Sequence, residues 1–366
     1  MSSIKIYLAL LGVGAALAMT GCPEEPPPEP VDEFPAPPSG QGFQFGTGEQ
    51  PVGAGEEVQN CFFFKVADLL EQGGMDPTKP LNLHRVQLKQ NEGSHHMNIF
   101  RVRTLTPEAD GGMDPEKGPY KNVGGTGPCF KSSNWADWPL VANTQIDGQL
   151  DWTFPDGVAN VIEPDEWIMV QSHFVNATTQ ETPDGSGKVE INFWHLPEDQ
   201  KVYEMGTLFA TKQSIRICQG LPDPEFSGGC QFNSAEPVTV VGANGHFHSR
   251  GKSFKMYTWD GIQTTTPPDT DKFYESDAWD EPEMAHGEDI ADIPANGGVF
   301  YTCDYQWTPP PDSIGCQGLN DFDQTKYMTP DEQLDCCYTF GPQVDRNEHC
   351  NIFVYYYPKS DDINCF

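Results

Sequence analysis

Residues 236–248 read EPVTVVGANGHFH, in which a β-branched run leads into Gly245 and two histidines separated by one phenylalanine. A run of this kind, bounded by Pro, Gly and Asn, is typical of a β-strand. Because alternate residues of a strand face the same side, His246 and His248 would lie together and Phe247 would point into the core. Two imidazoles on one face can share a metal ion. The alternative, two surface histidines on an edge strand, is disfavoured by Gly245 and by the apolar residues before it.

Short runs of the same kind recur along the chain, and from about residue 43 onward no long stretch has a helical period. The runs are rich in β-branched and aromatic residues, and the turn residues Gly (36) and Pro (33) are abundant. This pattern predicts an all-β fold of antiparallel sandwiches or barrels rather than an α/β fold. A break near residues 205–212 divides the body, and we expect domains at 46–207 and 208–366. The clearest other runs are NCFFFKV (60–66), HRVQLKQ (84–90), HMNIFRVRT (96–104), EWIMVQSHFV (166–175), KVEINFWHL (188–196), SFKMYTW (253–259), GVFYTCDYQW (298–307) and NIFVYYYP (351–358).

The 366-residue chain is strongly acidic, with a formal net charge of −33. A surface of this charge repels nucleic acid and anionic lipid, so neither is expected as a partner. Hydrophobic residues make up 37% of the chain and aromatic residues 11%, which is enough for real cores and excludes global disorder. We interpret the charge as a source of solubility, since attraction of cations by such a surface would be generic.

The N-terminus has the organisation of an export signal. Lys5 precedes an apolar run over residues 6–21, which is too short and too poorly flanked for a stable membrane-spanning helix. The run ends in MTGC, which resembles a bacterial lipobox, so we expect a signal peptide over residues 1–22 with lipidation at Cys22. Ordinary signal cleavage near the same point is the alternative. Residues 23–45 are rich in Pro and Glu and would form a semi-rigid tether. These features predict a lipid-anchored protein of the bacterial cell envelope that faces the periplasm or the exterior and contacts the membrane only through its lipid.

The chain has 11 cysteines, and setting aside Cys22 leaves an even number. An oxidising compartment then favours up to five disulfides. Metal binding by cysteine is disfavoured because the sequence has no C-x-x-C pair and because Cys336 and Cys337 are adjacent. Spacing alone does not determine the pairing.

Six of the nine histidines form two groups, each with a close pair and a distant third member. The first group is His95, His96 and His173, and the second joins His349 to the HFH pair. Adjacent strand residues face opposite sides, so His95 and His96 can bind one metal only at a bulge or a strand end. Taken alone, His173 fits a packing histidine and His349 a loop histidine. Two three-nitrogen groups on one exported chain nevertheless indicate a metalloenzyme.

Taken in order, these motifs resemble the copper type II, ascorbate-dependent monooxygenases, the family that includes peptidylglycine alpha-hydroxylating monooxygenase and dopamine beta-monooxygenase. The resemblance covers roughly residues 55–366. SHHMNIF is similar to the family's HHM motif and MVQSHFV to its Q-V-H-Y strand. NGHFHSRGK is similar to its H-x-H motif, and NEHCNIFVYYY to its D-E-M-C-N-L-Y segment. Cysteines in matching places are Cys61, Cys129, Cys218, Cys303, Cys350 and Cys365.

The resemblance implies two tandem jelly-roll-like β-sandwich domains that bind two coppers per chain, with a cleft between the copper sites. The first histidine group would hold an electron-transfer copper and the second an oxygen-binding copper. Ascorbate would reduce both coppers. Oxygen and a small-molecule or peptide substrate would then meet at the second site, where a C–H bond is hydroxylated.

Two departures from the family concern the second site. The family's third ligand there is Met, and His349 stands in its place; a third imidazole favours Cu(II), whereas a thioether favours Cu(I). Met328 is the alternative ligand from a nearby loop. Among the substrate-binding positions Asn351 is retained, but Asn244 and Phe353 replace the Arg and Tyr that hold a carboxylate in the peptidylglycine enzymes. A C-terminal glycine is therefore disfavoured as the substrate.

The resemblance also implies three disulfides, Cys61–Cys129, Cys218–Cys365 and Cys303–Cys350. It leaves Cys230, Cys316, Cys336 and Cys337 unpaired.

Three functions remain open from the sequence. The leading one is an extracytoplasmic copper-dependent monooxygenase. The second is a copper-binding lipoprotein for metal acquisition or electron transfer, without hydroxylase activity. The third is a zinc hydrolase that uses one histidine group, although no nearby Glu is well placed as its base.

Overall fold

The computed structural model describes residues 34–91, 94–123, 129, 138–145, 149–176, 187–279, 282–319, 336–341 and 345–366. Contacts divide the chain into a segment Met1–Pro35 and a compact unit Ala36–Phe366. Cys22, the signal peptide and most of the tether lie outside the described residues, as does Met328. No helix in the described part of the chain is long and apolar enough to cross a membrane.

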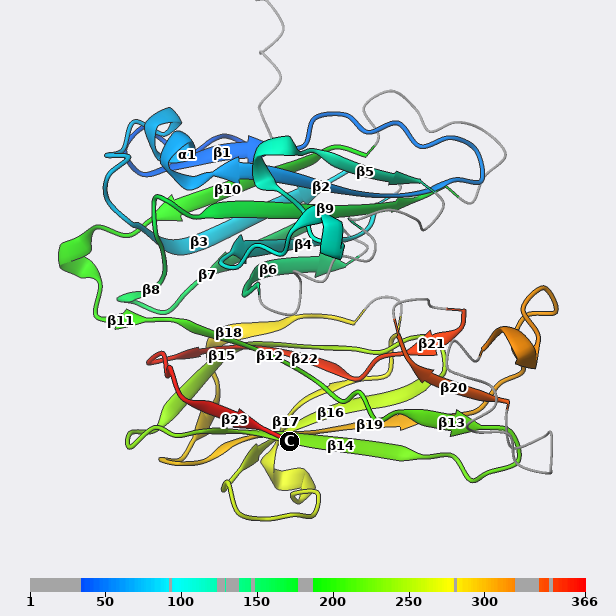
Figure 1. Ribbon diagram of the computed structural model, residues 1–366. Coiled ribbons are helices and arrows are strands. Elements are labelled where there is room, and N and C mark those ends of the chain that lie inside the picture. The colour runs from blue at the N-terminus through cyan, green and yellow to red at the C-terminus, as the bar shows by residue number, and fades with distance from the viewer. Residues whose placement is uncertain are drawn as a thin grey trace, which may run out of the picture. The chain divides into compact units, whose positions relative to one another are not determined.

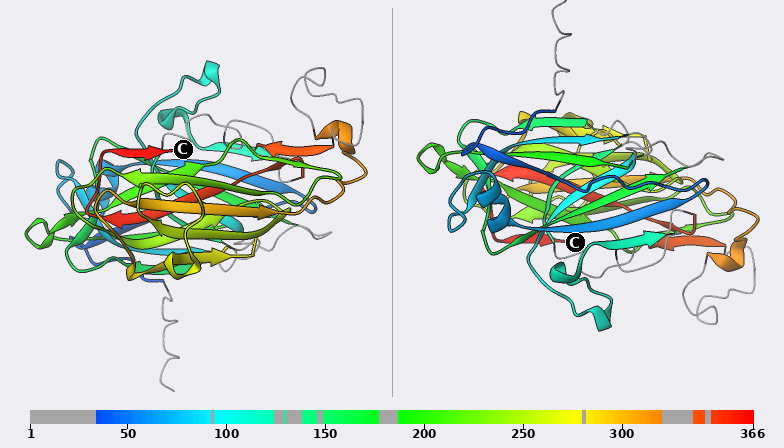
Figure 2. Two further views of the ribbon diagram at one scale, coloured as in Figure 1. Left: turned by 90° about the horizontal axis from the view of Figure 1, so that it is seen from below. Right: turned by 90° about the horizontal axis from the view of Figure 1, so that it is seen from above.

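The predicted all-β fold is confirmed, since the described elements are almost all strands (Figure 1). α1 (Val66–Gln72) is the one α-helix among the described residues, and it lies beside β1 (Gly42–Gly46) at the edge of the fold (Figures 1 and 2). The first four residues of β1, 42–45, fall inside the range 23–45 expected as tether. Phe43 and Phe45 of this strand are buried in the core, so these residues belong to the folded unit. Short 3-10 helices occur at Glu108–Asp110, Pro115–Lys117, Glu198–Gln200, Asp269–Asp271 and Cys316–Gly318.

The first half of the unit contains two sheets, and every pairing in them is antiparallel except β8–β11. One sheet has the order β1-β10-β3-β8-β11, with β7 also paired to β3, and the other has the order β5-β2-β9-β4-β6. The strands are β2 (Glu57–Lys65), β3 (Leu81–Gln90), β4 (Ser94–Val102), β5 (Tyr120–Val123), β6 (Leu140–Gln145), β7 (Gln149–Thr153), β8 (Val158–Ile162), β9 (Trp167–Val175), β10 (Val189–His195) and β11 (Tyr203–Glu204).

The second half contains a four-stranded sheet, β12-β22-β15-β18, and a five-stranded sheet, β17-β16-β19-β14-β23. A smaller sheet, β13-β20-β21, contains the strand that directly precedes His349. The strands are β12 (Gly206–Thr211), β13 (Arg216–Cys218), β14 (Glu225–Phe232), β15 (Val238–His246), β16 (Gly251–Trp259), β17 (Lys272–Ser276), β18 (Ala285–Ile293), β19 (Gly298–Tyr305), β20 (Cys337–Phe340), β21 (Asn347–Glu348), β22 (Asn351–Tyr357) and β23 (Ile363–Cys365).

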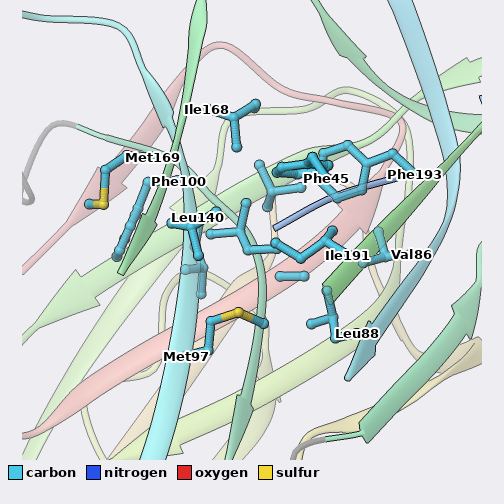
Figure 3. Close-up of a cluster of buried hydrophobic side chains, with 14 of the residues drawn as sticks. Phe45, Val86, Leu88, Met97, Phe100, Leu140, Ile168, Met169, Ile191 and Phe193 are labelled. Carbon is cyan, nitrogen blue, oxygen red and sulfur yellow. The ribbon is translucent and has the colours of Figure 1, made fainter. Parts of the chain in front are cut away.

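Each pair of large sheets encloses a hydrophobic core, as the strand alternation predicts. Figure 3 shows the first core, in which Phe45, Val86 and Ile191 from one sheet meet Met97 and Leu140 from the other. The second core lies between the four-stranded and five-stranded sheets. The first core also takes in Val241 of β15 and Tyr355 of β22, so side chains from the second half complete it.

All ten cysteines after Cys22 are paired in the structure. Cys61–Cys129 and Cys303–Cys350 are confirmed. The expected pair Cys218–Cys365 is wrong, because each of these residues lies directly opposite a different cysteine on a neighbouring strand. The observed pairs are Cys218–Cys337, Cys230–Cys365 and Cys316–Cys336.

Candidate metal centre

The structure brings His246, His248 and His349 together. Nitrogen atoms from the three rings all lie within 4.8 Å of one another. The ring centroids are 5.3 Å apart for His246 and His248 and 4.4 Å apart for His248 and His349. His246 is the last residue of β15, and it pairs with Asn351, the first residue of β22. His349 lies two residues before Asn351.

The local sequence of β15 explains why the pair points outward from the second core. Phe247 is 1% exposed and stacks on Phe254, with ring centroids 6.1 Å apart, so the predicted alternation is observed. A Cβ atom on Gly245 would lie 2.3 Å from the Phe254 ring, so this position must lack a side chain. The strand itself ends at His246, and His248 follows in the turn.

His248 is held in the form that a metal ligand requires. It is 3% exposed, and burial lowers its pKa to about 3, so its imidazole is neutral at physiological pH. Its Nδ1 lies 2.8 Å from the carbonyl oxygen of Asn347, to which it donates a hydrogen bond. This bond leaves the Nε2 lone pair available to a metal.

His349 has a buried Nδ1 with no hydrogen-bond partner among the described residues. Burial holds its pKa well below the usual value, and its ring lies 5.1 Å from that of Phe340. Its backbone is fixed because the Tyr305 hydroxyl donates to its carbonyl oxygen and Cys350 is disulfide-bonded to Cys303. A buried nitrogen without a partner, beside two other imidazoles, fits a ligand of a copper or zinc ion. The three imidazoles together already offer three donor atoms, so no thioether is needed as the third ligand.

Glu348 joins the two segments that supply these ligands. Its carboxylate accepts hydrogen bonds from the backbone N–H groups of His248 (2.8 Å) and Arg250 (3.0 Å). Burial raises the pKa of Glu348 to about 7, while these N–H donors and the Arg250 guanidinium act in the opposite direction.

His96 and His173, from the first group, are direct register partners on β4 and β9. Their Nδ1 atoms lie 3.4 Å apart and their ring centroids 4.6 Å apart. His95 lies in β4, and its side chain is outside the described residues. The register of β4 shifts between Ser94 and His96, which is the irregularity that adjacent histidines need in order to share a metal.

A row of amide side chains lies beside the first histidine pair and extends toward the second group. Gln171 and Asn98 are register partners two residues from His173 and His96, and Asn98 donates to Gln171 over 2.8 Å. Asn143 pairs with Asn98 in the next strand, and its amide reaches Asn244 of β15 over 3.5 Å.

The expected substrate-binding residues lie beside the three-histidine cluster. Asn351 pairs with His246 on one side and with Thr211 of β12 on the other. Asn351 Oδ1 and Thr211 Oγ1 are both buried and have no hydrogen-bond partner among the described residues. In the next row Phe353 contacts Phe209 across the strands, with ring centroids 5.1 Å apart.

Asn244 completes this second row, since it pairs with Phe353. It is fully buried and donates to the carbonyl oxygen of Pro282 over 3.0 Å. Sequence reasoning missed Thr211 and Glu348. The position of Glu348 inside the NEHCN segment was the available signal for it, whereas Thr211 becomes adjacent only through strand pairing.

Comparisons with known proteins identify no family. A scan with protein-family models finds no match, and no curated protein matches. Among solved structures the chain is similar to the cryo-EM structure of Broad Bean Stain Virus, with 8% sequence identity, coverage of 92% of this chain and 94% of that chain, and a TM-score of 0.31. A likeness at this TM-score carries no argument about function.

Proposed function

We propose that the protein is an extracytoplasmic copper-dependent monooxygenase that hydroxylates a C–H bond of an organic substrate. The observation that carries this proposal is the cluster of His246, His248 and His349, whose ring nitrogens all lie within 4.8 Å of one another. The His96 and His173 pair supports a second copper, and the amide row from Asn98 to Asn244 supports a connection between the two groups. The ordered likeness of the four motifs to the copper monooxygenases favours copper over zinc.

The reaction converts a C–H bond, O2, two electrons and two protons into a C–OH group and water, with ascorbate as a suitable two-electron donor. Bound copper would supply one-electron redox chemistry and a position for O2. His246, His248 and His349 would hold that metal through their ring nitrogens. His248 and Asn351 are shielded from water, with exposed fractions of 3% and 7%, whereas His246 and His349 are half-buried.

The residues beside the cluster favour a neutral substrate. Asn351 and Thr211 offer unused buried oxygen atoms for hydrogen bonds. Phe353 and Phe209 offer an apolar surface next to them. Neither row includes a Lys or Arg, so a substrate anchored by a carboxylate is disfavoured.

A second function is a copper-binding lipoprotein for metal acquisition or electron transfer. His349 favours this alternative, because a third imidazole in place of a thioether stabilises Cu(II) and lowers the reduction potential. The five disulfides agree with an oxidising compartment in both cases. Lipidation at Cys22 and an envelope location remain predictions.

Oxygen consumption distinguishes the two functions. We expect the copper-loaded protein to consume O2 with ascorbate, and to do so faster when neutral aromatic amides or alcohols are added. Isotopically heavy O2 should place its label in the product. The zinc-loaded protein is the control, since zinc has no redox chemistry. Tight copper binding without substrate-stimulated uptake would instead identify the copper-binding lipoprotein.

A further inference from the structure

Glu348 is the most completely buried acidic side chain beside the cluster, with no exposed surface. Its two carboxylate oxygens have separate tasks. Oε2 accepts from the backbone N–H of His248 over 2.8 Å, and Oε1 accepts from the backbone N–H of Arg250 over 3.0 Å. One carboxylate therefore fixes both ends of the turn that follows β15.

The side chain of Arg250 extends from that turn to the segment that carries Glu348. Its Nη1 lies 3.3 Å from Glu348 Oε1, and its Nη2 donates to the carbonyl oxygen of Asp345 over 3.2 Å. The guanidinium also lies 4.0 Å from the ring centre of Tyr338 in β20. The two segments are thus linked through both the carboxylate and the guanidinium.

A buried ion pair of this kind is weak as a source of stability. The Arg250 and Glu348 side chains are 5% and 0% exposed, so the cost of removing both from water offsets most of their attraction. What the pair does provide is fixed geometry, because its hydrogen bonds join the turn at 248–250 to the segment at 345–348.

The same segment supplies one ligand and orients another. Asn347 accepts from the His248 ring, Glu348 holds the His248 backbone, and His349 follows directly. We propose that Glu348 is a positioning residue that sets the relative placement of His248 and His349 for copper. The proposal rests on the copper function proposed above.

The physical reason concerns the two oxidation states of copper, which prefer different geometries. Ligands whose backbones and rings are held by further hydrogen bonds resist rearrangement, and loss of such partners typically weakens metal binding. Glu348 fixes the histidine backbone rather than only the ring, so its removal would free the whole turn.

The test is Glu348→Gln, in which one acceptor oxygen becomes an NH2 group facing a backbone N–H donor. Titration with Cu(II), followed by electron paramagnetic resonance, is expected to show about 10–100-fold weaker binding at the three-histidine site. The spectrum of that site should also change, while the signal of the His96 and His173 site stays as in the wild type.

Glu166→Gln is the matched control. Glu166 pairs with the buried Arg101 over 2.8 Å in the first half of the unit, so this variant also breaks a shielded carboxylate–guanidinium pair. It should lower thermal stability without changing the copper affinity or spectrum of the three-histidine site. Should Glu348→Gln not fold, Glu348→Asp, which keeps the charge but shortens the reach, is expected to alter the same spectrum.

An unchanged affinity and spectrum in a folded Glu348 variant would overturn the positioning proposal. An effect of equal size in Glu166→Gln would also overturn it, since general destabilisation would then be the cause. The proposed monooxygenase fails separately, when the wild type binds copper at this site but shows no substrate-stimulated oxygen uptake.

Discussion

Replacing His248 with alanine is expected to remove one of two copper equivalents and to abolish substrate-stimulated oxygen uptake. The reason is the geometry of the cluster. His248 is buried, neutral and oriented by Asn347, so the two remaining imidazoles would hold copper with fewer nitrogens and a void beside them. Copper analysis after dialysis measures the loss, and electron paramagnetic resonance identifies the site that remains.

His84→Ala is the control for this variant. His84 lies in β3, where its Nδ1 contacts the carbonyl oxygen of Val158, and it belongs to neither histidine group. This variant should keep both coppers. Loss of both coppers in His248→Ala would indicate a shared cluster rather than two independent sites, and loss of none would remove His248 from the ligand set.

Trp152→Ala is expected to lower the free energy of unfolding by about 3–5 kcal/mol, the range for removal of a large buried aromatic side chain. Trp152 of β7 is 1% exposed, and its ring lies 4.5 Å from Phe154 and 5.0 Å from Tyr355 of β22. A Cβ atom on Gly242 would lie 3.0 Å from the Trp152 ring, so the second half leaves space for this side chain. Denaturant unfolding monitored by circular dichroism measures the change.

Tyr355→Phe changes the other side of the Trp152–Tyr355 contact, and we do not expect it to lower the free energy of unfolding. The Tyr355 hydroxyl is buried and has no hydrogen-bond partner among the described residues, so its removal relieves an unpaired polar group. We expect stability to stay the same or to rise. A large loss of stability in Tyr355→Phe would mean that the hydroxyl has a partner, and a small loss in Trp152→Ala would mean that this contact is not a packed core.

Periodicity was sufficient to predict the strand class and the local geometry of the HFH motif. Phe247 packs in the core, as the two-residue repeat visible in the sequence predicts, although β15 itself ends one residue earlier, at His246. The shift of register at His95 could be expected for the same reason, since two adjacent histidines on a regular strand would face apart.

Properties that depend on which strands become neighbours could not be obtained in this way. Cys218 and Cys365 were paired with each other by resemblance, whereas strand register places each opposite another cysteine. Thr211 lies some 140 residues before Asn351, and only the pairing of β12 with β22 makes them adjacent. Glu348 has a role only once the turn after β15 reaches it.

The claim that His246, His248 and His349 form a copper site is tested most directly by X-ray absorption at the copper edge. The sample is the reduced His173→Ala protein, in which the first histidine group is impaired and the three-histidine site should hold the remaining copper. The account predicts nitrogen scattering from imidazoles and no copper–sulfur scattering. A copper–sulfur signal that disappears in Met328→Leu would contradict it, because Met328 and not His349 would then complete the site.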